Sequence, residues 1–243
     1  MRAPLIPRLA DSPDSPFPDP AANQREDGLL AWGGDLHPTR LLNAYAQGIF
    51  PWYEAPGPIL WWSPEPRAVM LPGGMHLSRR LRRTLRQGHY RVEADRAFNE
   101  VVAACAEPRD DQDGTWITPE MQAAYGRLHA MGHAHSIEIR DTDGQALIGG
   151  LYGVAIGRIF FAESKFHRRR DASKIALAAL MRALGEWEFM LCDCQLWNPH
   201  LERLGVRMLS GELFRAALAR GVVEDAAIDD WSAGIGQIDF SRW

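Results

Sequence analysis

The sequence predicts an α+β fold, in which a small N-terminal α/β domain precedes a larger domain with a mixed, mainly antiparallel sheet flanked by helices. Three observations predict this class. Short runs of alternating apolar and polar residues follow one another after residue 130, as in antiparallel strands. Helical patterns separate some of these runs, and the N-terminal third is rich in proline and aromatic residues. We expect two domains, at residues 1–70 and 71–243.

Composition excludes several classes of protein. The 243 residues are 46% hydrophobic and carry a net charge of −4, which allows a substantial core and gives no overall basic character. No apolar run approaches the roughly 20 residues of a membrane span, and the proline-rich start lacks the apolar segment of a signal peptide. Three cysteines are too few for a disulfide framework, so we expect a cytoplasmic protein in a reducing compartment.

The N-terminal part combines short elements with many aromatic residues. An apolar run at 28–32 predicts a strand, Gly33-Gly34-Asp35 a turn, and Pro38 the start of a helix that Gly48 ends. Five aromatic residues follow between positions 50 and 62. They are expected either to form a small hydrophobic core or to leave one or two rings accessible for stacking on a base.

A run of arginines follows the expected domain boundary. Ser78 is a typical N-cap for a helix at residues 79–86, in which Leu81 and Leu85 share a buried face. Such a run is often only a solvated surface, but like charges without countercharges repel one another, and a bound polyanion relieves that repulsion. We therefore expect this helix to bind a phosphate backbone through Arg79, Arg80, Arg82, Arg83 and Arg86.

The rest of the chain alternates between strands and helices. Thr118 and Pro119 are typical of the cap and first residue of a helix. Strands are predicted at 90–93, 134–139, 147–155, 159–164 and 191–196, and helices at 97–105, 119–131, about 173–184 and 198–204.

Three histidines invite a metal interpretation. His129 and His133 have helical spacing, but Gly132 breaks the helix between them, and no cysteine or acidic ligand lies near them or His135. We therefore expect structural histidines and no metal site.

The strand at 191–196 carries the polar residues of greatest interest. Asp193 and Gln195 are two residues apart, so both side chains are expected on one face of the strand. An acid and an amide in an apolar strand are costly to bury without partners. Glu163 raises the same question in the preceding strand. These groups either form hydrogen bonds at the edge of the sheet or project into a pocket.

Eight short motifs occur in a fixed order along the chain. They are GLLAWGGDL (28–36), GIFPW (48–52), WWSPEPR (61–67), GTWIT (114–118), GHAHS (132–136), GGLYG (149–153), ASK (172–174) and DCQ (193–195). Each is weak alone, but the ordered set is specific. Over roughly residues 15–215 the chain resembles the leucyl/phenylalanyl-tRNA–protein transferase family.

The resemblance implies an aminoacyltransferase that moves Leu or Phe, with Met as a further candidate, from aminoacyl-tRNA to the N-terminal Arg or Lys of proteins. The transfer marks those proteins for degradation. The larger domain would be GNAT-like, although the glycine-rich loop that holds acetyl-CoA in GNAT acyltransferases is absent at residues 168–174. The expected partners are charged tRNA and acceptor proteins, with no cofactor and no membrane, and the expected state is a monomer.

The resemblance also implies roles for residues. Asp193, Gln195 and Glu163 would be the catalytic residues facing the ester and the amine. Arg168 would join the five helix arginines in binding tRNA. The substrate-binding residues would be Trp52 and Trp116 for the terminal adenosine, Leu151, Phe160, Leu177 and Leu180 for the Leu or Phe side chain, and Tyr125.

We hypothesise that Asp193 orients Gln195, whose amide oxygen accepts a hydrogen bond from the α-amine. The proton then leaves through Asp193, Glu163 or the departing ribose hydroxyl. Three alternatives remain open: a GNAT enzyme with a small acyl-CoA donor, a non-catalytic RNA-binding protein, and a related transferase for acidic N-termini.

Overall fold

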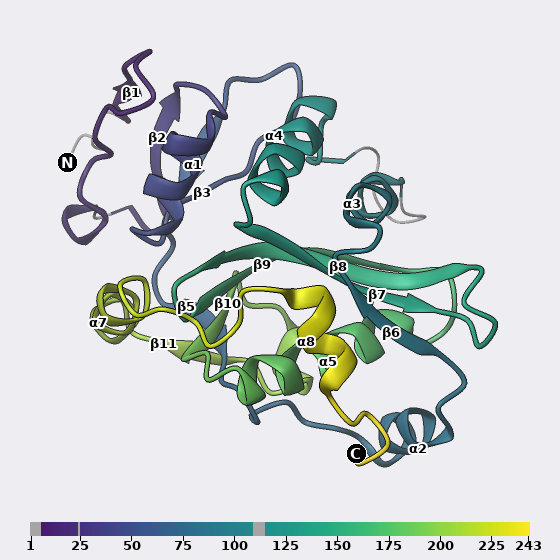
Figure 1. Ribbon diagram of the computed structural model, residues 1–243. Helices are drawn as coiled ribbons and strands as arrows, with labels where there is room; N and C mark the ends of the chain where they lie inside the picture. Colours follow the sequence, from purple (N-terminus) through teal and green to yellow (C-terminus); the bar gives the residue numbers. More distant parts are fainter. Residues whose placement is uncertain (1–5, 24, 109–114) are drawn as a thin grey trace.

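A computed structural model describes residues 6–23, 25–108 and 115–243, so that Gly114 of the fourth motif lies outside these ranges. Two sheets organise the described chain (Figure 1). The smaller has the order β1-β2-β4-β3, and the larger β11-β5-β10-β9-β8-β7-β6. None of the helices in these ranges combines the length and apolar character that a membrane span requires.

The small sheet belongs to the N-terminal part. Its strands are β1 (Arg8–Leu9), β2 (Leu29–Gly33), β3 (Phe50–Pro51) and β4 (Leu60–Trp62). Helix α1 (Pro38–Tyr45) lies beside it, capped by the imidazole of His37, which accepts a hydrogen bond from the Thr39 amide. The aromatic segment contains both buried and accessible rings, because Trp61 is fully buried whereas Trp52 is 41% exposed; stacking on a base stays a prediction.

The large sheet is mixed and mainly antiparallel, as expected, since only β9 and β10 are parallel neighbours. The α+β class is confirmed. Its strands are β5 (Arg67–Met70), β6 (Arg91–Ala94), β7 (Ala134–Arg140), β8 (Leu147–Ile156), β9 (Ile159–His167), β10 (Leu191–Gln195) and β11 (Arg207–Leu209).

Helices cover both faces of this sheet (Figure 1). Helices α3 and α4 and the N-terminal part pack on one face, where the first core includes Tyr125, Tyr152 and Phe161. Helices α5 and α8 cover the other face, where the second core includes Phe160 and Leu177. The helices are α2 (Arg79–Gln87), α3 (Phe98–Ala106), α4 (Pro119–Ala130), α5 (Ala172–Glu186), α6 (Pro199–Arg203), α7 (Gly211–Gly221) and α8 (Trp231–Gln237).

Strand β5 connects the N-terminal part to the rest of the chain. A boundary at residue 70 would place β5 in the N-terminal domain, yet β5 pairs with β10 and β11 inside the large sheet. The division into two domains stays a prediction, and we propose that the boundary lies before Arg67.

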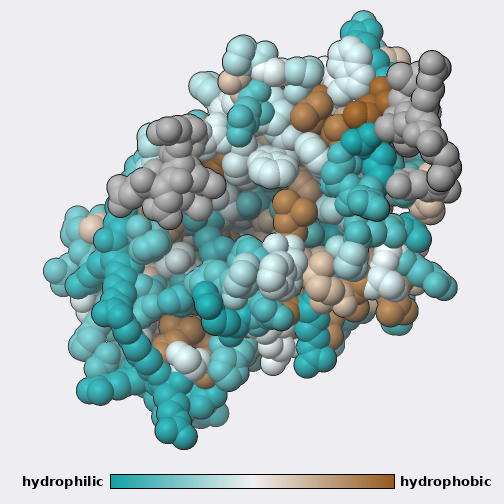
Figure 2. All heavy atoms as spheres, turned by 180° about the vertical axis from the view of Figure 1, so that it is seen from behind, coloured by the Kyte–Doolittle hydropathy of each residue, from teal (hydrophilic) through white to brown (hydrophobic). Residues whose placement is uncertain are grey.

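Most predicted elements form within one or two residues of their expected ends, but two parts of the chain differ. Strand β9 continues to His167 instead of ending at residue 164. Beyond residue 205, β11, α7 and α8 were not predicted. The rear face in Figure 2 is mainly hydrophilic, with hydrophobic atoms in small separate patches.

Candidate active site

A buried ion pair lies at the centre of the candidate site. Asp193 on β10 is fully buried and accepts two hydrogen bonds from Arg67 on β5, at 2.8 Å from Nε and 2.7 Å from the second nitrogen. The Arg67 guanidinium lies between the rings of Phe50 and Phe214, 5.0 and 4.8 Å from their centroids. Both oxygens of Asp193 therefore accept hydrogen bonds from Arg67, which hold the carboxylate in one position.

Gln195 occupies an unusual backbone conformation. The pairing of β10 with β5 shifts register between Asp193 and Gln195, and Gln195 has a φ of 61°. The Gln195 backbone N–H donates to Asp193 Oδ1 at 2.8 Å. Asp193 thus orients Gln195, as we hypothesised, but through the main chain. A non-glycine residue in the left-handed region is held there at an energetic cost, a feature that clusters at functional sites.

Glu163 is the extra residue in a bulge of β9. In the ladder of β8 and β9, Tyr152 pairs with Ser164 and Gly153 with Ala162, which leaves Glu163 unpaired between them. Its carboxylate accepts a hydrogen bond from Gln195 Nε2 at 2.8 Å and one from the Tyr125 hydroxyl at 2.6 Å. Because the Gln195 nitrogen faces Glu163, the Gln195 amide oxygen is directed away from it.

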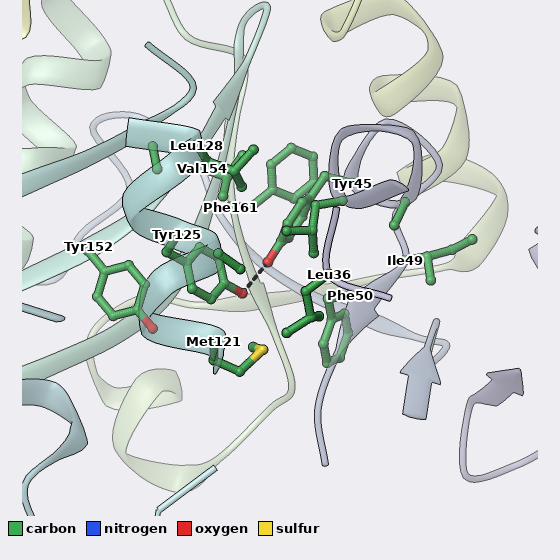
Figure 3. Packing of buried hydrophobic residues seen from close by; sticks show 14 of the residues in the cluster. Leu36, Tyr45, Ile49, Phe50, Met121, Tyr125, Leu128, Tyr152, Val154 and Phe161 are labelled. Carbon is green, nitrogen blue, oxygen red and sulfur yellow. Dashed lines mark hydrogen bonds between the residues drawn. The ribbon is translucent and has the colours of Figure 1, made fainter. Parts of the chain in front are cut away.

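Two tyrosines continue this network into the N-terminal part. Tyr45 of α1 and Tyr125 of α4 are both buried, and their hydroxyl oxygens lie 2.6 Å apart. Figure 3 shows the two side chains pointing toward each other from these helices. Burial raises the pKa of both phenols well above their ordinary value, so both stay protonated and donate hydrogen bonds. The position of Glu163 therefore depends on α1 as well as on the sheet.

The environment of Glu163 makes its carboxyl group titrate near neutrality. Burial raises the pKa of Glu163 to about 7, and the charge of Asp193 adds to this rise. Hydrogen bonds from Tyr125, Tyr45 and Gln195 oppose it. An acid with such a pKa can hold or release a proton at physiological pH, which suits the transfer of a proton from an amine.

The raised pKa also predicts a pH-dependent stability. Between the ordinary pKa of 4.5 and about 7, the unfolded chain loses the Glu163 proton before the folded chain does, so stability falls as pH rises. Glu163→Gln removes this titrating group, so its stability relative to wild type should rise by about 3 kcal/mol from pH 4 to pH 8. Urea unfolding at both pH values measures the difference.

The matched control for this prediction is Glu186→Gln, which removes an exposed carboxylate from α5. It should follow the wild-type pH dependence closely. Parallel stability curves for wild type and Glu163→Gln would contradict the raised pKa.

The expected substrate-binding residues fall into two groups. Trp116 is half-buried and packs against the first core, and exposed Trp52 has its ring 5.8 Å from that of Trp62. The four residues expected around the Leu or Phe side chain all belong to the second core, on the α5 side of the sheet: Leu151, Phe160, Leu177 and Leu180.

Strands β9 and β10 are paired over only part of their length. The last registered pair of these strands is Phe161 and Asp193, although β9 continues to His167. Glu163 and Gln195 lie two residues beyond that pair, where β9 and β10 are no longer paired with each other.

The expected tRNA-binding arginines divide into three sets. Arg80 forms an ion pair with Asp171 at the start of α5, 3.4 Å away. Arg168 pairs with Glu107 at 2.5 Å and lies over the Phe166 ring, and its part in binding tRNA stays a prediction. The other α2 arginines line one surface hollow with Gln87: Arg79, Arg82, Arg83 and Arg86.

Two of the three histidines considered as metal ligands, His129 and His135, have other partners. His129 Nδ1 lies 2.8 Å from the Ala134 carbonyl oxygen, and its ring stacks on Phe98. His135 pairs with Asp95 at 2.7 Å and stacks on Trp231. Among the described residues, no group of three or more His, Cys, Asp or Glu side chains is arranged to hold a metal ion.

Arg67 and Tyr45 were not predicted from the sequence as residues of the site. An arginine in the otherwise apolar segment 67–70 needs a buried anion, and Asp193 was the unexplained acid. The unexplained arginine and the unexplained acid together could have predicted this ion pair from the sequence. Tyr45 carried no comparable signal, because a tyrosine on the apolar face of a helix is ordinary core composition.

The site combines a carboxyl group of raised pKa, an oriented amide and a fixed ion pair at the place where two parallel strands part. The buried thiol of Cys192 is unsuited to act as a nucleophile, because a hydrogen bond with Cys194 and burial raise its pKa well above its ordinary value. These groups fit a transferase that brings an amine directly to an activated acyl group.

Comparisons with known proteins identify the family. The model of the leucyl/phenylalanyl-tRNA protein transferase matches residues 69–219, and the model of its N-terminal domain matches residues 34–65. The chain belongs to the leucyl/phenylalanyl-tRNA protein transferase family.

Two relatives of that name illustrate the similarity. One from Alkalilimnicola ehrlichii is 53% identical over 214 residues, covering 87% of this chain and 82% of its own. One from Aromatoleum aromaticum is 51% identical over 228 residues, covering 94% and 95%. A solved structure, L-PGS from Bacillus licheniformis, shares 10% identity over 64% of each chain with a TM-score of 0.39, too low to support a conclusion.

Proposed function

We propose that this protein transfers Leu or Phe from aminoacyl-tRNA to the N-terminal Arg or Lys of acceptor proteins. Family membership supports the reaction class, and the contact between Gln195 and Glu163 is the observation that supports the chemistry. The acceptor proteins are thereby marked for degradation. The enzyme works as a monomer in the cytoplasm, where charged tRNA is found.

In this mechanism the oriented amide positions the incoming amine. Gln195 Nε2 is held by Glu163 and the Gln195 main chain by Asp193, so the amide oxygen is free to accept a hydrogen bond from the α-amine. The amine attacks the ester carbonyl carbon, a C–N bond forms, and the bond to the ribose oxygen breaks. Glu163, with a pKa of about 7, takes up the proton that the amine loses and passes it to the departing ribose oxygen, which leaves as a hydroxyl.

The donor binds across the point where β9 and β10 part. Trp52 and Trp116 hold the terminal adenosine on the side of the first core. The amino-acid side chain enters between the strands toward Leu151, Phe160, Leu177 and Leu180. All four are now buried and packed, so the pocket opens by small movements of these side chains when the donor binds.

We further propose that the larger domain is GNAT-like. Three antiparallel strands, β7 to β9, are followed by helix α5 and by β10, which pairs parallel to β9 and then leaves it. This order of elements and the parting of the two parallel strands are the supporting features.

A transfer assay tests the proposed function. Labelled Leu or Phe on tRNA is incubated with the enzyme and a protein bearing N-terminal Arg, and a second protein bears N-terminal Glu. Label on the Arg protein alone is the expected result. Label on the Glu protein would overturn the acceptor specificity, and label on neither protein would overturn the transferase activity.

The exposed ring of Trp52 gives a second test. Trp52→Ala should raise the KM for aminoacyl-tRNA about 5- to 150-fold, since base stacking contributes about 1–3 kcal/mol. Initial-rate kinetics at several tRNA concentrations measure the change. Trp32→Ala is the matched control, because Trp32 is similarly exposed and carries no expected role. An equal change in both variants would count against a stacking role for Trp52.

A further inference from the structure

A second hollow lies on the other side of α2 from the arginine-lined one. It is a pocket of about 420 Å³ between the first turns of α2 and α5 and helix α6. Three histidines, His76, His167 and His200, also line it. Its charged lining consists of four cations and one carboxylate: Arg80, Arg170, Lys174, Arg203 and Asp171. Like charges from three separate elements therefore converge on one concave surface.

The single carboxylate positions cations without neutralising the pocket. Asp171 accepts a hydrogen bond from Lys174 at 2.9 Å and pairs with Arg80 at 3.4 Å. It thereby connects α2 with α5. Arg170 and Arg203 are exposed, and no ion pair is found for either of them among the described residues. Three positive charges remain in excess, a condition that a bound anion relieves.

The surroundings of His200, which also lines the pocket, are positively charged as well. Burial lowers the pKa of His200, and the charges of Lys165, Lys174 and Arg203 lower it further. Cations thus surround the imidazole from β9, α5 and α6, which are three different parts of the fold.

Two chain segments lead from the polar cluster to this pocket. His167 follows Glu163 by four residues on β9, a distance of about 13 Å at the rise of a strand. His200 follows Gln195 by five residues through the turn into α6. About 13 Å corresponds to roughly four nucleotides of a stacked strand. The pocket is therefore within reach of the nucleotides next to an ester bound at Gln195.

We propose that this pocket, which includes Arg170, Lys174 and Arg203, binds phosphate groups of the single-stranded 3′ end of the donor tRNA. This inference rests on the proposed function, because it takes the donor to be a tRNA. It adds a phosphate subsite between the ester and the outer arginines of α2. Cations that contact successive phosphates bind a polynucleotide without reading its sequence, as a donor end shared by different tRNAs requires.

The variant Arg170→Gln/Arg203→Gln tests the proposal. Neither side chain has a described structural partner, so the fold should persist, which circular dichroism and thermal unfolding check. Titration with deacylated tRNA at several salt concentrations should show at least tenfold weaker binding at low salt. The slope of log K against log salt should become shallower by about 1.5, since each phosphate contact contributes about 0.7–0.9. Arg96→Gln/Arg207→Gln removes two exposed arginines elsewhere and should bind as wild type does.

A comparison of donors separates this proposal from the proposed function. The double variant should lose at least ten times more kcat/KM with aminoacyl-tRNA than with aminoacyl-adenosine, which has no phosphate. An equal loss on both donors, or an unchanged salt slope, would overturn the phosphate subsite while leaving the transferase activity intact. Wild-type enzyme that transfers from neither donor would overturn the proposed function itself.

Inorganic phosphate distinguishes the two sources of the ligand. At constant ionic strength, phosphate should compete with tRNA for the wild-type enzyme and lose this effect in the double variant. Phosphate that binds in the pocket without weakening tRNA binding would assign the site to a free phosphate ion and overturn the tRNA role.

Discussion

Gln195→Ala is expected to lower the single-turnover rate of transfer by about 10²- to 10³-fold, the usual loss when one oriented polar group is removed from a reacting centre. The Gln195 amide contacts Glu163 at 2.8 Å and presents its oxygen to the amine. Alanine removes both interactions but leaves the backbone bond from residue 195 to Asp193 possible. Rapid quenching with pre-bound aminoacyl-tRNA and saturating acceptor measures the chemical step.

The neighbouring residue supplies the control. Cys194→Ala changes a partly exposed side chain in the same bulge without touching the Glu163 contact, so its rate should remain within about threefold of wild type. Gln195→Glu keeps the shape but places a second carboxyl group beside Glu163, and it should be slow as well. A Gln195→Ala rate close to that of Cys194→Ala would mean that the ester reacts without help from the amide.

Arg67→Met is expected to lower the free energy of unfolding by about 3–5 kcal/mol, because it leaves the Asp193 carboxylate buried without its countercharge. Both side chains are at most 1% exposed, so water cannot replace the lost partner. Urea unfolding followed by fluorescence measures the loss.

The double variant Arg67→Met/Asp193→Leu isolates the cause. Since the unpaired charge is gone, it should recover a large part of the stability that Arg67→Met loses, although it should have little transferase activity. The matched single change is Arg220→Met, which breaks the exposed pair with Glu224 and should leave stability nearly unchanged. Arg67→Met that is as stable as Arg220→Met would contradict the importance of the buried pair.

The fold was predictable wherever local signals define an element. Ser78 caps α2, and Thr118 caps α4 with Pro119 in its first turn, as the sequence predicts. Helix caps and helix periodicity depend on residues that are at most four or five positions apart, so both can be identified from the sequence alone. The pairing of β5 with β10 could not be predicted in this way, because the two strands lie more than a hundred residues apart in the sequence.

The candidate site was predictable in composition but not in geometry. Glu163, Asp193 and Gln195 stood out as polar residues in apolar strands, and the structure brings them together with Tyr125. Strand alternation placed Asp193 and Gln195 on one face by assuming a regular strand. The bulge at this point and the φ of 61° break that regularity, and neither is encoded in the spacing of apolar residues.

The pairing of β5 with β10 also determines when the enzyme can become complete during its synthesis. Arg67 leaves the ribosome 126 residues before Asp193, which corresponds to roughly 6–25 s at ordinary elongation rates. Through that interval β5 has neither of its neighbours in the sheet, because β10 and β11 do not yet exist. The N-terminal sheet and the β7–β9 ladder can form earlier from contacts close in sequence. Assembly of the active site is thus one of the last steps in the folding of the newly synthesised chain.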